Sequence, residues 1–292
     1  MILFKKEREI GEIINDTFKF TRQNFKTLLK VFVKFVTPSF IILLLGVGYY
    51  SYISVNNNFF SSYMSGNPGV TGMDDLPDFF SKILLGSLFL IITLYTFYAF
   101  LFGSILYSIK SYIKNEGKIV IAEVGDNMKQ NWGSLFGLSF ASLIMLFVGF
   151  MLCIIPGIYL WPPLMLIYAI KVFNNLSISE SISYSFKLIK NNWFTTFISF
   201  LIIGALWYFA SMVFQLPIII YSFSKGFLTA YEGTYANLET DWVLLSLQLL
   251  GSALQYVAYF IIVIASAFIY FNLNEKQQKT GAYEAIDELG KM

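Results

Sequence analysis

Side chains suited to catalysis or metal binding are scarce in this sequence. The chain of 292 residues contains no histidine and one cysteine, Cys153. Histidine is the side chain that most readily changes charge near neutral pH and the commonest metal ligand, and one thiol makes neither an intrachain disulfide nor a thiolate cluster. Asp74, Asp75 and Asp78 could bind Ca²⁺ weakly, although a solvated acidic loop is the simpler interpretation. We therefore expect no enzymatic activity, no cofactor and no metal site.

The long apolar segments also lack a charged residue well inside them. An ionisable group inside a membrane span is a candidate functional residue. Lys34 and Lys171, however, lie near the ends of such segments, where a lysine side chain can reach the interface. The deeper polar residues are neutral and are typical of hydrogen bonds between helices. They include Gln215, Gln248, Gln255, Thr93 and Ser142.

The elements that must carry all these residues are membrane helices. Hydrophobic residues make up 57% of the chain and charged residues 13%, about half the charged share of a soluble domain. A spanning helix needs about 20 mostly apolar residues. The run from Leu135 to Ile170 is too long for one helix and is divided at the turn pair Pro156-Gly157. We predict an all-α integral membrane protein with six transmembrane helices: Phe35 to about Val55, Ile83 to Ile109, the two halves of Leu135 to Ile170, Trp193 to Ser224, and Val243 to Asn274.

The distribution of basic residues predicts the orientation of these spans. With six spans, both termini and two connections share one side of the membrane. Of the 20 Lys and Arg residues, 18 fall on that side, and only Lys82 and Lys225 fall on the other. Basic residues accumulate in cytoplasmic loops, so both termini are predicted to be cytoplasmic. The N-terminus shows no pattern of a cleavable signal peptide. The opposite side has two longer polar loops, Asn56 to Phe80 and Lys225 to Asp241.

An internal threefold repeat accompanies the spans. The segment from Ile10 to Phe25 aligns without a gap with the segment from Ile178 to Trp193, and a shorter third copy runs from Ile121 to Trp132. Each copy leads into two spans, which is the mark of a repeated structural unit. We predict a single membrane domain, 1–292, built as three repeats of an interfacial amphipathic helix plus a transmembrane hairpin. The units lie near 10–112, 119–173 and 177–274, followed by a cytoplasmic tail, 275–292.

The repeated helices are amphipathic and basic. In the last copy, Ile178, Ile182 and Phe186 recur on one helical face. Ser177 with Glu180 fits a capping box at the start of the helix. Such helices lie in the plane of the membrane surface with their basic groups toward anionic lipid headgroups. The residues predicted to contact headgroups are Lys19, Arg22, Lys26, Lys129, Lys187, Lys190, Trp132 and Trp193.

The hairpin at Pro156-Gly157 is the most unusual local feature. The helix from Ile158 to Phe173 has 16 residues, or about 24 Å, whereas the hydrocarbon core is about 30 Å thick. A second proline pair is expected to disrupt its first turns, and backbone groups freed at that depth need partners or water. One interpretation is an outward-facing recessed pocket, and the other is a buried packing kink with an interfacial aromatic belt. The candidate residues are Pro156, Gly157, Tyr159, Trp161, Pro162, Pro163 and Tyr168.

Two stretches carry a resemblance to a known group of bacterial proteins. They are Pro156-Gly157-Ile158-Tyr159-Leu160, continuing to Phe173, and Leu176 to Trp193 with its Glu, Ser, Lys, Asn and Trp pattern. The two together resemble the YciC-like proteins and the membrane domain attached to some glycerophosphodiester phosphodiesterases. The resemblance implies a multi-pass protein of the bacterial inner membrane. It implies no phosphodiesterase activity, because no phosphodiesterase domain is recognised in the chain.

The favoured function is that of a non-enzymatic membrane protein. It would act in lipid or membrane organisation, or as a component of a membrane complex, with anionic lipids as partners at the cytoplasmic face. The alternative is a transporter or channel for a neutral or lipidic solute. An integral-membrane enzyme is the least supported function, because histidine and buried carboxylates are missing. A membrane-protein partner or a homo-oligomer is compatible with the favoured function, and we expect no nucleic-acid partner.

Overall fold

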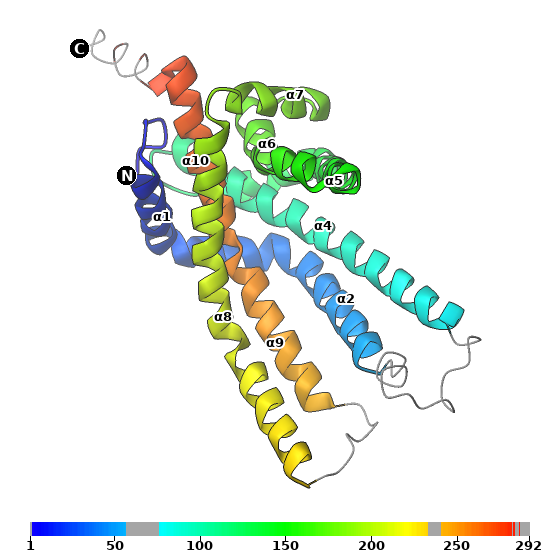
Figure 1. Ribbon diagram of the computed structural model, residues 1–292. Helices are drawn as coiled ribbons and strands as arrows, with labels where there is room; N and C mark the ends of the chain where they lie inside the picture. Colours follow the sequence, from blue (N-terminus) through cyan, green and yellow to red (C-terminus); the bar gives the residue numbers. More distant parts are fainter. Residues whose placement is uncertain (1, 57–75, 233–240, 282, 284–285, 287–292) are drawn as a thin grey trace. The chain divides into compact units, whose positions relative to one another are not determined.

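The computed structural model describes residues 2–56, 76–232, 241–281, 283 and 286 (Figure 1). Most of the polar loop from Asn56 to Phe80, including Asp74 and Asp75, lies outside the described residues, as do residues 233–240 of the second polar loop. The helices are α1 (Ile10–Val31), a π-helical stretch η1 (Phe32–Val36), α2 (Thr37–Asn56), α4 (Leu76–Lys114), α5 (Ile121–Leu152), α6 (Ile154–Asn174), α7 (Ile178–Ile189), α8 (Trp193–Glu232), α9 (Trp242–Ala258) and α10 (Phe260–Gln278).

Six helical segments in the described part of the chain are long and apolar enough to cross a membrane. The shortest is α6, whose 21 residues extend about 32 Å and match a hydrocarbon core of about 30 Å. The prediction of an all-α, multi-pass membrane protein is therefore confirmed. The segments are Ile10–Ser54, Phe80–Lys114, Ile121–Leu152, Ile154–Asn174, Trp193–Leu228 and Trp242–Gln278.

The described residues form two compact units, and α4 and α8 contribute to both. The second unit comprises residues 38–94 and 209–258. In it, the Gln215 amide of α8 donates to Gln255 Oε1 of α9 at 3.2 Å, as predicted for these neutral polar residues. Thr93 instead donates to the Leu90 carbonyl of its own helix at 2.9 Å, a bond that satisfies the hydroxyl locally.

The first unit comprises residues 1–37, 95–208 and 259–292, and its core includes the N-terminal segment. Phe4 is buried and stacks on Phe268 of α10 with a centroid distance of 4.5 Å. The backbone N–H of Arg8 donates to Asn272 Oδ1 at 2.8 Å. Because Gly281 packs so closely on Lys5 that a side chain there would meet the Lys5 carbonyl, the segment before α1 and the segment just after α10 lie side by side.

The turn between α5 and α6 lies at Cys153, which corrects the predicted break at Pro156-Gly157. Cys153 alone has an extended backbone, and Pro156-Gly157 belongs to the first turns of α6. A proline is tolerated there because the first N–H groups of a helix have no intrahelical partner. Gly157 is needed for close packing, since an added Cβ would run into the Phe150 ring of α5.

Pro162 and Pro163 do not disrupt α6, which runs unbroken from Ile154 to Asn174. The expected interruption of the first turns is therefore wrong. A proline at 163 cannot donate to the carbonyl four residues earlier, and that carbonyl belongs to Tyr159. The Trp193 indole N–H donates to the Tyr159 carbonyl at 3.1 Å. A side chain from α8 thus supplies the donor that the proline lacks, and the helix continues.

Candidate functional site

Helix α1 carries three distinct faces. Its protein face is buried and includes Ile13, Thr17 and Phe20. At 100° per residue, the predicted apolar stripe of Ile10, Ile14, Phe18 and Phe25 lies on an adjacent face. Phe18 and Phe25 are exposed on this face rather than buried against the protein. The third face carries the exposed basic residues Lys19, Arg22, Lys26 and Lys30. The apolar stripe is therefore free to contact something outside the unit, with cations along its edge.

Helix α7 has the same three faces and packs on α6 (Figure 1). Its buried face uses Ser181 and Ser185, whose small side chains permit close helix packing. Both hydroxyls donate to carbonyls of the preceding turn at 2.7 Å. The predicted stripe of Ile178, Ile182 and Phe186 is only half-buried. Lys187 and Lys190 are exposed beside it.

The start of α7 confirms the predicted capping box. The Ser177 backbone N–H donates to Glu180 Oε2 at 2.8 Å, and the Glu180 N–H donates to the Ser177 hydroxyl at 3.3 Å. These contacts with the Ser177 hydroxyl and backbone lower the pKa of Glu180 from its ordinary value. Glu9 and Glu12 form the equivalent capping box at the start of α1.

Positions that the sequence alignment pairs have matching environments in α1 and α7. Ile13 and Ser181 are both buried, as are the next pair on that face, Thr17 and Ser185. The cations at the other edge, including Lys19 and Lys187, are exposed in both helices. The two helices thus present the same order of faces: protein, apolar surface and basic surface.

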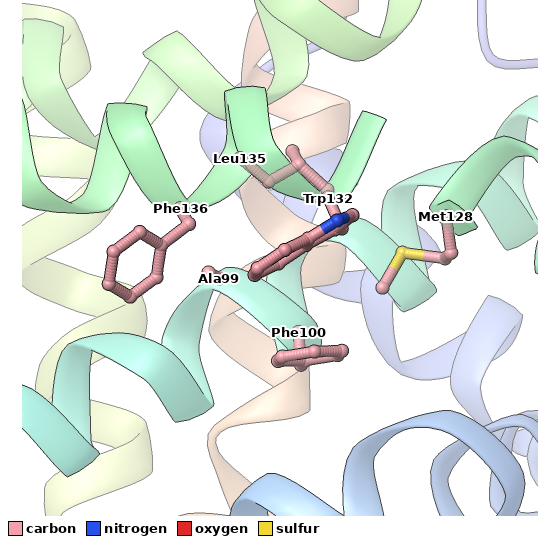
Figure 2. A pocket seen from close by; sticks show the side chains of 6 residues that line it. All are labelled: Ala99, Phe100, Met128, Trp132, Leu135 and Phe136. Carbon is pink, nitrogen blue, oxygen red and sulfur yellow. The ribbon is translucent and has the colours of Figure 1, made fainter. Parts of the chain in front are cut away.

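Trp132 of α5 was predicted to contact headgroups and has a mixed environment. It is 55% exposed and lines a shallow apolar depression between α4 and α5 (Figure 2). In Figure 2 its indole ring lies above Phe100 of α4, and the ring centroid lies 6.4 Å from that of Phe136. Lys129, three residues earlier, is exposed. The remaining lining residues are Ala99, Met128 and Leu135.

The aromatic residues of the predicted outward pocket have separate environments. Tyr159 stacks on Trp193 at a centroid distance of 5.6 Å, Trp193 stacks on Phe197 at 5.2 Å, and Trp161 meets Phe197 edge-on at 5.9 Å. Tyr168 is buried elsewhere: its hydroxyl is 2.5 Å from that of Ser139, and its ring stacks on Phe102. Tyr159 and Trp161 therefore belong to an aromatic row along α8, and Tyr168 belongs to the core.

Tyr159 and Trp193, which the sequence placed at opposite membrane surfaces, are in direct contact. The sequence placed Tyr159 near the outer surface and Trp193 at the cytoplasmic surface. Two such positions would be separated by the hydrocarbon core, about 30 Å. Because the Trp193 indole donates directly to the Tyr159 carbonyl at 3.1 Å, the two residues lie at one level. The position of Pro163 in the sequence could have indicated that the Tyr159 carbonyl lacks its usual intrahelical donor. It could not indicate which side chain would supply a donor instead.

Two polar clusters were not found by sequence reasoning. Glu123 at the start of α5 accepts hydrogen bonds from Lys114 at 2.6 Å, Asn115 at 2.8 Å and Ser111 at 2.9 Å, which fixes the connection between α4 and α5. Arg8 is buried and pairs with Asp16 at 2.9 Å. The sequence counted both Lys114 and Arg8 only as cytoplasmic charges.

Groups of metal-ligating side chains are absent from the part of the chain that the structure describes. Comparison with protein-family models, with curated proteins and with solved structures finds no match to this chain. The candidate site is therefore defined by its own geometry, as the exposed apolar and basic faces of α1 and α7.

Proposed function

We propose that this chain is a non-enzymatic, multi-pass protein of the bacterial inner membrane that binds anionic lipid at the cytoplasmic surface. The observation that carries the proposal is the three-faced helix α1. Phe18 and Phe25 are exposed on one face, and Lys19, Arg22 and Lys26 are exposed on the next. An apolar stripe bordered by cations fits the boundary between acyl chains and headgroups. Lipid or membrane organisation, or a place in a membrane complex, follows from such an anchor.

The size of the electrostatic contribution supports a stable surface contact. A basic residue near an anionic membrane surface contributes about 1 kcal/mol. The three exposed cations of α1, Lys19, Arg22 and Lys26, would together contribute up to roughly 3 kcal/mol. Screening by salt lowers this contribution because these charges are exposed.

The proposal includes a topology with both termini in the cytoplasm and a repeated architecture. The sorting of 18 of the 20 basic residues supports this sidedness, and the packing of Gly281 on Lys5 is consistent with two ends on one side. The matching environments of α1 and α7 support the repeat. So do Val124 and Met128 of α5, which are buried at positions aligned with Ile13 and Thr17. The resemblance to YciC-like proteins points in the same direction.

The test compares lipid retention by two charge-matched variants. The full chain is reconstituted with a mixture of phosphatidylglycerol and phosphatidylcholine, extracted gently, and its bound lipids are counted by native mass spectrometry. We expect enrichment of phosphatidylglycerol, lost in the double variant Lys19→Gln/Lys187→Gln. The control Lys118→Gln/Lys276→Gln removes two exposed charges outside the helix faces and should retain it. Equal retention by both double variants would contradict the proposal.

The same proteoliposomes test the alternative function. A transporter or channel would accelerate the exchange of a neutral or lipidic tracer across the bilayer. We expect no acceleration over protein-free vesicles. A flux that persists in Lys19→Gln/Lys187→Gln would favour the alternative over surface binding.

A further inference from the structure

Two lysines from different helices meet at the C-terminal end of α6. Lys110 of α4 donates from Nζ to the Val172 carbonyl at 2.6 Å. Lys171 immediately precedes Val172 and is only 7% exposed. The sequence predicted that Lys171 would extend to the interface, and in the structure packing covers most of its side chain. The Lys110 ammonium therefore lies next to the residue that follows the second lysine.

The negative charge nearby is already engaged. Glu123 and Glu180 are the acids whose charge reaches the two lysines. The Glu123 carboxylate, however, is held by Lys114 at 2.6 Å, and the Glu180 carboxylate accepts from the Ser177 backbone at 2.8 Å. Among the described residues, neither Lys110 nor Lys171 forms an ion pair.

The end of α6 compensates only part of this positive charge. The C-terminus of a helix is equivalent to roughly half a negative elementary charge, against two full positive charges. The Val172 carbonyl gives Lys110 one acceptor, and no hydrogen bond is formed by the Lys171 ammonium in the described structure. Packing covers most of the Lys171 side chain, but in the described structure its Nζ is not one of the fully buried polar atoms without a partner, so a ligand can reach the ammonium group. The two ammonium groups therefore have hydrogen-bond donors left for an anion with several oxygen acceptors.

We propose that Lys110 and Lys171 together bind a phosphate group, carried either by a lipid headgroup or by a soluble phosphate. Each ammonium has three donors and acts as a compact point charge, which suits the several oxygens of a phosphate. Lys110 lies one helical turn before the end of α4, and Lys171 one turn before the end of α6. The ends of spanning helices lie at the level of lipid phosphates. The site uses none of the exposed cations of α1 and α7.

The experiment uses the full chain, delipidated in a maltoside detergent that contains no phosphate. Its melting temperature is measured with inorganic phosphate against chloride at equal ionic strength. Short-chain phosphatidylglycerol is then compared with diacylglycerol of the same chain length. Binding to the folded state raises the melting temperature. A rise with inorganic phosphate identifies a soluble ligand, a rise with phosphatidylglycerol alone identifies a headgroup, and either supports the site.

Variants separate this site from the helix faces. Lys171→Met keeps the apolar stem and removes the charge, so we expect a higher melting temperature without ligand. Its affinity for the effective probe should be about ten- to hundredfold weaker, while Lys19→Gln/Lys187→Gln should keep the full response. If Lys171→Met does not fold, Lys110→Met provides the same comparison.

Two results would overturn the site. One is a wild-type protein that gains no more from either phosphate probe than from chloride or diacylglycerol. The other is a Lys171→Met response equal to that of the wild type. Because the first result needs no variant, the proposal is testable even if both substitutions impair folding. Failure of the lipid-retention test on α1 and α7 would leave this outcome unaffected.

Discussion

Replacing Arg8 should destabilise the protein far more than replacing Lys6, although the two residues are neighbours and both form ion pairs. The Arg8 Nε donates to Asp16 at 2.9 Å, and the two side chains are 1% and 23% exposed. The Arg8 guanidinium also donates to the carbonyls of Leu3, Phe4 and Lys6 and lies 5.0 Å from the Phe268 ring centroid. The Arg8 side chain therefore fixes the backbone conformation of residues 3–6 and attaches this segment to α10.

The two ion pairs differ mainly in their exposure to solvent. Lys6 and Glu12 are 3.0 Å apart, with side chains 52% and 49% exposed. Exposed pairs contribute about 0–1 kcal/mol. Removal of one partner from a buried pair costs about 3–5 kcal/mol, and the partial exposure of Asp16 favours the lower end, near 3 kcal/mol. The difference of at least about 2 kcal/mol corresponds to roughly a 30-fold change in the unfolding equilibrium.

The assay compares Arg8→Ala, Arg8→Lys and Lys6→Ala by reversible unfolding in mixed micelles, at low and high salt. Arg8→Ala should lose stability at both salt concentrations, whereas the small effect of Lys6→Ala should vanish at high salt because exposed charges are screened. Arg8→Lys should resemble Arg8→Ala, since a lysine lacks the planar set of donors. Hydrogen exchange should show loss of protection in residues 2–8. Equal effects of Arg8→Ala and Lys6→Ala would refute the reasoning.

Three further outcomes follow from individual contacts. Cys153, the single cysteine, lies between exposed apolar residues, with Leu152 76% and Ile154 68% exposed. With both termini in the cytoplasm and α5 and α6 as a transmembrane hairpin, this turn faces the outside, so Cys153 should react with an impermeant maleimide added outside right-side-out vesicles. Labelling by a membrane-permeant maleimide alone would contradict that sidedness. Trp193→Phe removes the donor to the Tyr159 carbonyl and should lower the free energy of unfolding by about 0.5–1.5 kcal/mol in the same assay. The control Trp207→Phe should not show this loss, because the Trp207 indole N–H has no partner. The lowered pKa of Glu180 means that its contribution to stability is complete above the unfolded pKa and is lost as pH falls through the lower folded value. The hydrogen-exchange protection factors at the start of α7, which correct for the intrinsic effect of pH on exchange, should therefore fall on acidification in the wild type and stay constant in Glu180→Gln. An identical pH response of the protection factors in both proteins would exclude the capping role.

Several features of the fold were predictable because they depend on residues close together in the chain. Uncharged runs such as Ile83 to Ile109 exceed the length that a bilayer requires, so the spans followed from length and hydropathy alone. The capping box of Ser177 and Glu180 was predictable for the same reason, because its partners are three residues apart. The basic stripes of α1 and α7 followed from helical periodicity.

The environment of each candidate residue depended instead on partners far away in the chain. Arg8 is fixed by Asn272, 264 residues later, and the Tyr159 carbonyl is satisfied by Trp193, 34 residues later. Lys171 lies at the end of an apolar run, where an interfacial lysine is expected, but the packing around α6 covers most of its side chain. Local spacing determines which residues share a helical face. Only the packing of helices decides which face is covered and which charged side chain is shielded from solvent. The sequence by itself therefore determined the membrane helices and their basic faces, and the tertiary structure decided that Lys110 and Lys171 meet without a counter-charge.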